Sequence, residues 1–409
     1  MYSKSSPQKI AYIVSLFPKL SETFIVNELR ELMKIGTQIE IFSLSKRKEK
    51  IVHKDAMPLV SHVHYPHNNF SGLLRRIIMV AYKPLLSLHI IFTVIVHNII
   101  YKGRPLKAFY TVMHAFEFAF LIRCRKIHHI HAHFFTSPSL AAWVICRLTG
   151  ISFSATGHAH DIFCPMPLVK RIFLDMKFLV TISEYNRQYL VKHYGSIVEK
   201  KIVVIHCGIR IDIFHPQARG TEVHKDTWHL LSIGRLVDYK GFPVLIKACT
   251  ILKDHNMKFH CRIIGSGPDF AQLNKMIHKA NLQEVISLLG DQKQTKIREL
   301  LMDTDIFILA SQRGSDGQQD GIPVVLMEAL AMGIPSISTK ISGIPELIRD
   351  GENGLLVDPQ SPEMLAEAIE MLIHDTALRQ RFHCMGPLTI DIDYNSKSNT
   401  ARLNRLFWS

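Results

Sequence analysis

Asp320 and Glu328 are two carboxylates, with seven residues between them, around the start of an expected helix. An apolar strand is predicted just before them, over Ile306 to Ala310, and Pro323 suits the first helical turn, where its missing N–H is not needed. The amides of that turn and the helix dipole favour a bound phosphate. Acids beside a phosphate indicate contacts to hydroxyl groups, as on a ribose or sugar. The alternative is an acidic first turn that only stabilises its own helix, by about 1 kcal/mol or less.

A pair of cations lies upstream, in the run SIGRLVDYKGF from Ser232 to Phe242, directly after the apolar stretch His229 to Leu231. Arg235 and Lys240 are five residues apart across a predicted strand-to-helix turn. Both can reach one diphosphate, the Arg through its two-pronged guanidinium and the Lys as a mobile point charge. As isolated residues they can equally be solvated surface cations.

A glycine turn separates these two segments, in the run RIIGSGP from Arg262 to Pro268. Gly265 and Gly267 end a predicted strand there, but the third glycine of a dinucleotide fingerprint is missing, and the chain has no P-loop pattern. The turn alone is therefore a weak signal for a nucleotide.

In this order and spacing, the three segments resemble the donor half of retaining nucleotide-sugar glycosyltransferases with two Rossmann-like domains (GT-B type, glycosyltransferase family 4 or group 1). They are most similar to the bacterial exopolysaccharide and colanic-acid-type members. The resemblance spans nearly the whole chain. Further matching runs are IAYIVSLFPKLSETFIVNELREL from Ile10, FSATGHAHDIF from Phe153 to Phe163, TISE from Thr181 to Glu184, VVIHCGIRIDIFHP from Val203 to Pro216 and GIPE from Gly343 to Glu346.

His158 matches the histidine that lines the cleft in this family, and His160 is the second candidate. A lone histidine after a strand can also be a satisfied structural residue. In similar proteins the loop at Ser21, Glu22 and Thr23 faces the interdomain cleft. This chain has Pro18 to Ser21 where many relatives carry paired glycines, so a phosphate contact from that loop is not predicted.

The resemblance implies an enzyme, a retaining, metal-independent glycosyltransferase of hexosyl type that uses a nucleoside diphosphate sugar. Arg235 and Lys240 would hold the diphosphate and stabilise the leaving charge. Asp320 would contact donor-sugar hydroxyls, Glu328 the ribose, and His158 the sugar, where it would steady the developing oxocarbenium ion. The departing phosphate would itself accept the acceptor's proton, so no covalent nucleophile is assigned. The implied catalytic residues are His158, Arg235, Lys240 and Asp320, and the donor-binding residues are Gly234, Arg235, Lys240, Gly265, Gly267, Asp320, Gly321, Ile322, Pro323 and Glu328.

Asp320 departs from the family, which most often has glutamate at this position. Its reach is one methylene shorter. The difference can alter donor preference, can be absorbed by a small backbone shift, or can be met by Asp316 in the preceding glycine-containing run.

The length of 409 residues fits two domains of about 200 residues each. Short apolar strands alternate with amphipathic helices, for example strands over Lys258 to Ile264 and Val285 to Leu289, which predicts parallel sheets covered by helices. The expected fold is α/β, with two Rossmann-like domains whose parallel sheets face a central cleft. The expected divisions are an acceptor-side domain over 1–205, a donor domain over 206–385, and a C-terminal helix over 386–409 that packs back on the first domain.

Positive charge is concentrated in the first half of the chain. Residues 1 to 215 hold 28 Lys and Arg against 12 Asp and Glu, or +16, whereas the remainder holds 21 against 23, or −2. An anionic membrane surface attracts such cations, and no nucleic-acid-binding motif accompanies them, so a membrane partner is favoured over nucleic acid. The clusters are Lys46, Arg47, Lys48 and Lys50; Arg75, Arg76 and Lys83; and Lys102, Arg104 and Lys107.

The apolar run PLLSLHIIFTVIVHNII, from Pro84 to Ile100, is shorter and more polar than a membrane-spanning helix of about 20 residues. It can be a buried core helix or a surface helix that lies in the membrane interface. No secretory signal precedes the first strand, and seven scattered cysteines without a C-x-x-C pair are typical of reduced thiols. The expected location is therefore the cytoplasmic face of the membrane, with a lipid-linked or growing saccharide as acceptor, in exopolysaccharide biosynthesis.

Histidines 128, 129, 131 and 133 suggest a metal site, but the sequence shows no carboxylate or thiol at ligand spacing, so neither a metal nor another cofactor is expected. Two other functions stay open. A sugar-nucleotide epimerase of the same architecture would turn over donor without acceptor, and a non-catalytic relative would bind lipid-linked saccharide as an assembly partner. Retention of Arg235, Lys240 and Glu328 together disfavours the non-catalytic reading.

Overall fold

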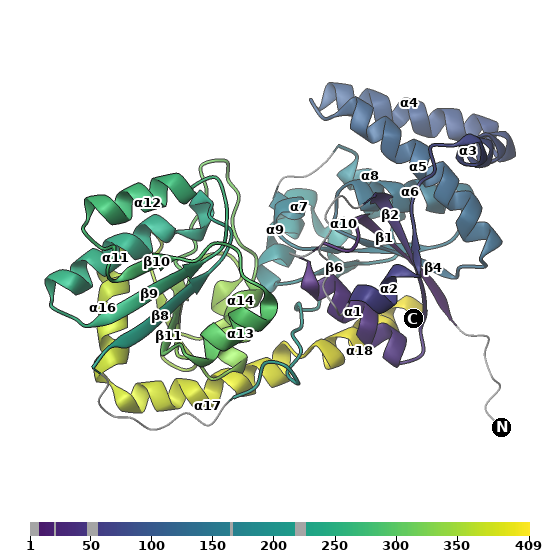
Figure 1. Cartoon of the computed structure of the whole chain (residues 1–409). Helices are drawn as coiled ribbons and strands as arrows, with labels where there is room; N and C mark the ends of the chain where they lie inside the picture. Colours follow the sequence, from purple (N-terminus) through teal and green to yellow (C-terminus); the bar gives the residue numbers. More distant parts are fainter. Residues whose placement is uncertain (1–7, 20–21, 47–55, 164–166, 217–225) are drawn as a thin grey trace, which may run out of the picture. The chain divides into compact units, whose positions relative to one another are not determined.

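The computed structural model describes residues 8–19, 22–46, 56–163, 167–216 and 226–409 (Figure 1). The chain forms two compact units, one from residues 1–206 and 396–409 and the other from residues 207–395. Several residues named from the sequence lie outside the described ranges, namely Ser21, Arg47, Lys48 and Lys50.

The first unit contains a sheet whose strands all pair in parallel, in the order β3-β2-β1-β4-β5-β6-β7. Helices cover a parallel sheet on both faces, so its central strands are buried: all of β4 and β5, and Ile10 to Val14 of β1, are buried. The strands are β1 (Lys9–Leu16), β2 (Gln38–Ser45), β3 (Val63–His64), β4 (His129–His133), β5 (Phe153–Gly157), β6 (Leu179–Thr181) and β7 (Ile202–Val204).

Ten helices of the first unit connect these strands within the described ranges, and an eleventh comes from the C-terminus. One large core lies between the sheet and α5, α6 and α8, and a second lies beneath α1 and α18. The helices are α1 (Thr23–Lys34), α2 (Met57–Val60), α3 (Phe70–Tyr82), α4 (Pro84–Ile100), α5 (Pro105–Cys124), α6 (Ser137–Thr149), α7 (His160–Phe163), α8 (Val169–Asp175), α9 (Glu184–Tyr194), α10 (Ser196–Glu199) and α18 (Ser396–Trp408).

The second unit repeats this architecture with a parallel sheet in the order β10-β9-β8-β11-β12-β13. The strands predicted near residues 258–264, 285–289 and 306–310 are present. Its elements are β8 (Trp228–Ile233), η2 (Asp238–Lys240), α11 (Phe242–Asp254), β9 (Phe259–Ile264), α12 (Phe270–Lys279), β10 (Ile286–Leu288), α13 (Gln294–Met302), β11 (Ile306–Ile308), α14 (Val324–Ala331), β12 (Ser336–Thr339), α15 (Ile344–Leu347), β13 (Leu355–Val357), α16 (Pro362–His374) and α17 (Thr376–Asp393).

The expected C-terminal helix over 386–409 is wrong in its extent. Residues 376–393 form α17, which packs on α14 of the second unit, and Ile390 and Tyr394 are fully buried in that unit's core. Only Ser396 onward belongs to the first unit, where α18 packs against α1. The apolar residues at 390 and 394 are one helical turn apart, and this spacing holds the segment on the second unit.

Each sheet reverses its strand order once, between β1 and β4 in the first unit and between β8 and β11 in the second. In open parallel sheets, ligands bind outside the carboxyl ends of the strands at such a switch point. In the second unit this position is formed by the loop after β8, which carries Arg235 and Lys240, and the loop after β11, which carries Asp320. The sheet topology therefore brings together residues that are 80 positions apart.

The run from Pro84 to Ile100 is a single helix, α4, as its composition predicted. In the described part of the chain, no single helix has the length and hydropathy to cross a membrane. Taken together, α3 and α4 have them, but the two helices are bent by 107° where they meet. In Figure 1 they lie at the outer edge of the first unit, next to α5.

Phe407 of α18 is 2% exposed and packs among the rings of Tyr12, His129, His131 and Phe178. We expect Phe407→Ala to destabilise the first unit by about 3–5 kcal/mol, because it leaves a large cavity. Urea unfolding followed by tryptophan fluorescence would measure the loss. Arg405→Ala, on the exposed side of the same helix, should change stability by less than about 0.5 kcal/mol. Equal stability of the two variants would contradict a core role for α18.

Candidate functional site

Lys240 and Asp320 are in direct contact at the switch point of the second unit. The Lys240 Nζ lies 2.7 Å from Asp320 Oδ1, and the Ser311 hydroxyl donates to Asp320 Oδ2 at 2.6 Å. Both charged side chains are mostly buried, at 12% and 11% exposure. Each carboxylate oxygen still has a free acceptor position, since an oxygen of this type can accept two hydrogen bonds. The pair is thus a fixed cation beside an acceptor of hydroxyl groups.

Backbone and side-chain hydrogen bonds fix the two loops to each other. Asp238 of η2 accepts from the backbone N–H and the hydroxyl of Ser315, at 2.8 and 2.9 Å. Gln312 donates its backbone N–H to Tyr239 O and its side-chain amide to Asp238 O, both at 2.8 Å. The hydrogen bonds from Ser315 hold the pKa of Asp238 below its usual value. The Lys240–Asp320 contact is therefore supported by a network that spans both loops.

The glycine turn after β9 packs directly on the loop after β8. A Cβ at Gly265 would lie 1.9 Å from Gly234 O, and one at Gly267 would lie 2.2 Å from Leu236 O. Gly265 also has φ of +139°, which side chains rarely adopt. Leu236 N–H donates to Ser266 O at 2.9 Å and locks the two loops together. The glycines are thus required for close backbone packing that shapes the loop carrying Arg235.

Arg235 is exposed, and no carboxylate of the described residues forms a salt bridge with it. Burial and then Asp320 raise the pKa of the Tyr239 phenol, and the positive charge of Arg235 partly opposes this increase. Arg235 and Asp320 therefore act electrostatically on the same tyrosine. An exposed guanidinium here can bind an anion from solvent.

The helix predicted after Asp320 is α14, and Pro323 immediately precedes its first residue instead of lying in its first turn. Ile322 is buried at 5% exposure and anchors this start in the core, while Gly321 and Val324 are partly exposed. The first amides of a helix lack intrahelical acceptors. The start of α14 can therefore supply N–H donors beside Asp320.

Glu328 lies one turn inside α14 and is partly buried. None of the described residues donates a hydrogen bond to its carboxyl group, and burial raises its pKa to about 8. A carboxyl group in this state is available to a ligand. The structure records no contact between Glu328 and the Lys240–Asp320 pair.

His158 follows β5 in the first unit and is almost completely buried. Its backbone N–H donates to Asp161 Oδ1 at 3.0 Å, and its carbonyl accepts from the buried amide of Asn186. Its ring stacks on His133, with 5.4 Å between the centroids. Burial, and then His133, hold the pKa of His158 well below its usual value, so the ring is neutral. Of the second candidate, His160, only its position at the start of α7 is described.

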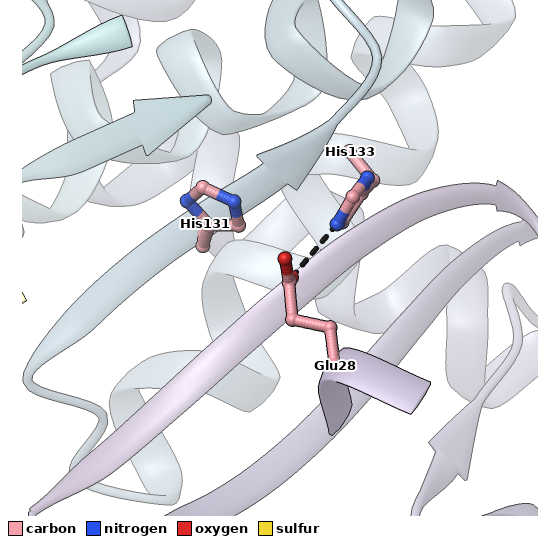
Figure 2. Close-up of side chains that lie close together, drawn as sticks. All are labelled: Glu28, His131 and His133. Atoms are coloured by element: carbon pink, nitrogen blue, oxygen red, sulfur yellow. Dashed lines mark hydrogen bonds and ion pairs between the residues drawn. The ribbon is translucent and has the colours of Figure 1, made fainter. Parts of the chain in front are cut away.

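His133 connects His158 to Glu28 of α1, as Figure 2 shows for the Glu28 contact. His133 Nε2 lies 2.8 Å from Glu28 Oε1, and His133 Nδ1 lies 3.3 Å from His158 Nε2. Tyr12 also donates its hydroxyl to Glu28 Oε1, at 2.8 Å. In the neutral form of His133, donation from Nε2 to the carboxylate leaves Nδ1 to accept from His158 Nε2–H. Glu28 thereby sets the tautomer of His158.

The histidine-rich strand β4 is a buried polar ladder. His129, His131 and His133 share one face, since alternate residues of a strand point the same way. His131 bonds to Ser154 and Thr156 of β5 at 2.8 and 3.0 Å. Burial, with Lys177 nearby, lowers the pKa of His129 to about 3, and burial holds that of His131 well below its usual value. His129 and His131 are therefore neutral hydrogen-bonding groups.

Glu28 from α1 lies beside these histidines, a carboxylate that does not stand at ligand spacing in the sequence. Glu28, His131 and His133 offer ligand atoms within 4.8 Å of one another (Figure 2). Sequence spacing could not show this, because the carboxylate lies on another element. However, the ring nitrogens of His131 and His133 already have protein partners. Metal binding would have to displace those partners, so the geometry supports a hydrogen-bonded network.

Sequence reasoning missed several residues that position the site. Ser311 directly follows the predicted apolar strand, and Asp238 lies two residues before Lys240. These positions are the signal in the sequence that could have identified both residues. Glu28, His133 and Tyr12 gave no signal as a group, since they come from three separate elements. Asp316 was an alternative to Asp320, but its carboxylate accepts from Gln318, whereas Asp320 contacts Lys240.

The Lys240–Asp320 pair should show a measurable coupling. We expect Lys240→Met to destabilise the second unit by about 1–3 kcal/mol, because it leaves a mostly buried carboxylate without its cation. Asp320→Asn alone should also destabilise. The double variant should be more stable than the sum of the two changes, as urea unfolding in a double-mutant cycle would reveal. Strict additivity would mean that the contact contributes nothing to folding.

Glu328 should make stability fall as pH rises. Between its ordinary pKa of 4.5 and the folded value of about 8, the folded state holds a proton that the unfolded state has lost. Stability therefore decreases over this range and levels off above pH 8. Glu328→Gln should be more stable than the wild type at pH 9 by on the order of 1–3 kcal/mol, with a smaller difference at pH 5. Glu363→Gln, at an exposed helical position, is the control; a pH-independent Glu328→Gln effect would contradict the raised pKa.

Two family profiles match successive parts of this chain. Residues 21–213 match Glycosyltransferase Family 4, and residues 216–386 match Glycosyl transferases group 1. The chain is 28% identical over 389 residues to WcaL of Salmonella typhimurium, a putative colanic acid biosynthesis glycosyltransferase. This alignment covers 90% of this chain and 92% of WcaL. It is 37% identical over 203 residues to the amylovoran biosynthesis glycosyltransferase AmsK of Erwinia amylovora, covering 50% of this chain and 48% of AmsK.

Solved structures share the fold along almost the whole chain. The glycosyltransferase from Rickettsia africae ESF-5 has a TM-score of 0.74 at 19% identity, with 98% of each chain covered. Anabaena HepE, solved in complex with UDP and glucose, has a TM-score of 0.70 at 15% identity, with 97% of this chain and 98% of HepE covered. With two parallel Rossmann-like units and a family profile on each half, the chain belongs to the glycosyltransferases of group 1 and family 4, and its fold is GT-B.

Proposed function

We propose that this glycosyltransferase transfers a sugar, with retention at the anomeric carbon, from a nucleoside diphosphate sugar to a lipid-linked or growing saccharide in exopolysaccharide biosynthesis. The observation that carries the proposal is the Lys240–Asp320 contact at the switch point of the second unit. The names of WcaL and AmsK support the pathway, and the UDP and glucose bound to HepE support the class of donor.

The diphosphate would be held by Arg235, Lys240 and the first amides of α14. Arg235 is exposed and can form two parallel hydrogen bonds to phosphate oxygens. Lys240 is held in place by Asp320, so its charge is positioned before the donor arrives. As the bond to the sugar breaks, these groups stabilise the negative charge on the leaving phosphate. That phosphate then accepts the proton of the attacking hydroxyl on the same face.

Asp320 would bind hydroxyl groups of the donor sugar through its unused acceptor positions. Ser311 and Lys240 occupy one position on each oxygen, so the carboxylate cannot swing without breaking both contacts. A lysine and a serine thus fix the orientation of the shorter aspartate side chain. Donor preference would depend on this fixed geometry.

His158 would contact the sugar as a neutral imidazole, a role that rests on the family resemblance. A neutral ring suits a transition state with positive charge on the sugar, because an imidazolium would repel that charge. Glu28 and His133 hold the ring in one tautomer. No metal ion is required in this scheme, since the cations and the start of α14 meet the diphosphate. We place the reaction on the cytoplasmic face of the membrane, where an anionic lipid surface and the lipid-linked acceptor are both available.

Donor binding and turnover test this proposal. A panel of nucleoside diphosphate sugars would be titrated by calorimetry, with EDTA present, against the wild type, Arg235→Ala, Glu328→Ala and the exposed control Lys275→Ala. We expect micromolar binding of one donor, weakened about 10- to 100-fold by loss of Arg235 and unchanged by Lys275→Ala. In slow donor hydrolysis, proton NMR should show the released sugar with the donor's anomeric configuration before mutarotation.

Other outcomes of the same experiment would contradict the proposal. Absence of donor binding, or binding that ignores both site variants, would favour a non-catalytic assembly partner. Conversion of the donor to an isomer without acceptor would identify an epimerase. Loss of binding in EDTA, restored by a divalent cation, would overturn metal independence.

Glu328 should make donor affinity increase with pH. A carboxylate that accepts from two ribose hydroxyls must be ionised, and a pKa of about 8 means that the proton has to leave on binding at pH 6. We expect affinity to rise between pH 6 and pH 9 in the wild type, and this rise to disappear in Glu328→Gln. Calorimetry in buffers of different ionisation enthalpy would count the released proton. Binding that releases no proton would exclude Glu328 from the ribose contact.

A further inference from the structure

Large apolar side chains are exposed in one part of the first unit. Of the 25 such residues exposed among the described ranges, 14 lie between residues 70 and 110, about a tenth of the chain. Monomeric proteins rarely expose apolar groups in so concentrated a manner. We call this set the apolar surface; it comprises Phe70, Leu73, Leu74, Ile77, Ile78, Tyr82, Leu85, Leu88, Phe92, Ile99, Ile100, Tyr101, Leu106 and Tyr110.

Helix α4 buries a face of mixed polarity, which includes Ile90 and Val94, and apart from His89 its exposed positions carry apolar side chains. Ser87, Thr93 and Asn98 are buried, at 0%, 6% and 6% exposure. Asn98 donates back to Val94 O at 2.8 Å, which satisfies its amide inside the protein. On the outer side, Leu85 is 84% exposed and Phe92 is 67% exposed. A helix in water has the opposite arrangement, so the outer face of α4 fits an apolar environment.

The charges around the apolar surface have one sign. The 61 residues from Ala56 to Phe116 contain no Asp or Glu and six Lys and Arg. Two of these cations, Arg75 and Arg76, turn inward to the fully buried Glu117, at 3.4 and 2.9 Å, and fasten α3 to α5. The other four form no salt bridge with the described residues and flank the junctions between the helices; they are Lys83, Lys102, Arg104 and Lys107.

The arrangement of α3 and α4 fits the plane of a membrane interface. Their 107° bend at Lys83 rules out one straight spanning helix. A helix in the interface buries one apolar face and keeps its cations at the lipid headgroups. Tyr82, Tyr101 and Tyr110 are at least half exposed and accompany those cations, as aromatic residues do at membrane interfaces.

We propose that α3, α4 and the first turns of α5 form a monotopic docking surface for an anionic lipid bilayer. The outward side chains enter the boundary between headgroups and acyl chains, and the four flanking cations contact anionic headgroups. This inference deepens the membrane partner of the proposed function by assigning it to particular helices. It assigns a role to the run from Pro84 to Ile100, which buries a face of mixed polarity in the protein and presents a mainly apolar one.

A second copy of the chain is a less suitable occupant. In a twofold symmetric dimer the same patch meets itself, so the four cations of one copy would approach those of the other. With no carboxylate between residues 56 and 116, no acidic partner for them lies on the patch itself. Anionic lipid supplies the complementary charge.

Co-sedimentation of the full chain with vesicles tests this surface. Vesicles of phosphatidylcholine that contain about one third phosphatidylglycerol would be compared with vesicles of pure phosphatidylcholine. Leu85→Ser/Phe92→Ser should weaken binding to the anionic vesicles about tenfold or more, on the scale of withdrawing one buried leucine or phenylalanine from lipid. Lys102→Glu/Arg104→Glu should weaken it at low salt. All four positions are exposed, so folding should be unaffected, which circular dichroism checks.

Matched controls separate this surface from general stickiness and general charge. Ile197→Ser removes an apolar side chain that is 58% exposed on α10, and Lys192→Glu/Lys200→Glu makes the same charge change elsewhere in the first unit. Both should bind vesicles as the wild type does. A Phe92→Trp variant should in addition be quenched by brominated lipid.

Three results would overturn the inference: vesicle binding that the controls weaken as much as the surface variants, binding of equal strength to both vesicle types, or a dimer in sedimentation equilibrium that Leu85→Ser/Phe92→Ser dissociates while no vesicles bind. Failure here is separable from failure of the proposed reaction. Donor binding and hydrolysis are measured without lipid, so the surface variants should retain them whether or not the docking assignment is right. Loss of vesicle binding with donor binding intact would therefore concern the docking surface alone.

Discussion

The contact between Lys240 and Asp320 is the interaction on which the switch point of the second unit depends. It requires two loops from different strands to meet within hydrogen-bonding distance, and three features of the chain bring this about. The parallel strand order places β8 beside β11, glycines at 265 and 267 let the neighbouring turn pack on the loop backbone, and Asp238 binds the second loop at Ser315. If either residue lost its partner, it would remain as a mostly buried, unpaired charge, which is costly.

The sequence predicted the two parallel α/β units and the loops that carry the cations, the glycines and Asp320, because these depend on local patterns. Apolar runs of strand length identify β8, β9 and β11, and the glycines and cations follow them directly. What it could not supply was contact between elements. Three contacts depend on tertiary packing: Asp320 with Lys240, Glu28 with His133, and α17 with the rest of the second unit. The pKa of Glu328 is of the same kind, since burial cannot be read from one residue's position in a helix.

The two units use buried polar groups in different ways. In the second unit, opposite charges pair at the end of the sheet. In the first unit, neutral histidines replace apolar residues along a central strand, and hydroxyl groups of the neighbouring strand satisfy them. A neutral ladder avoids the cost of burying charge and still presents hydrogen-bonding groups at the strand end, where His133 meets His158. Polarity thus extends along β4 to the carboxyl end of the sheet through hydrogen bonds to β5.

Helix α18 has a consequence for how the protein is made. The first unit begins with the first strand of the chain, but Leu403 and Phe407, from the last residues, complete one of its two cores. A ribosome therefore releases all of the second unit before it releases the helix that closes the first. During synthesis the face formed by Tyr12, His129 and Phe178 stays uncovered for the time needed to translate almost 200 residues. The second unit has no such dependence and can fold as soon as α17 emerges, so the unit that is synthesised later can be the first to finish folding.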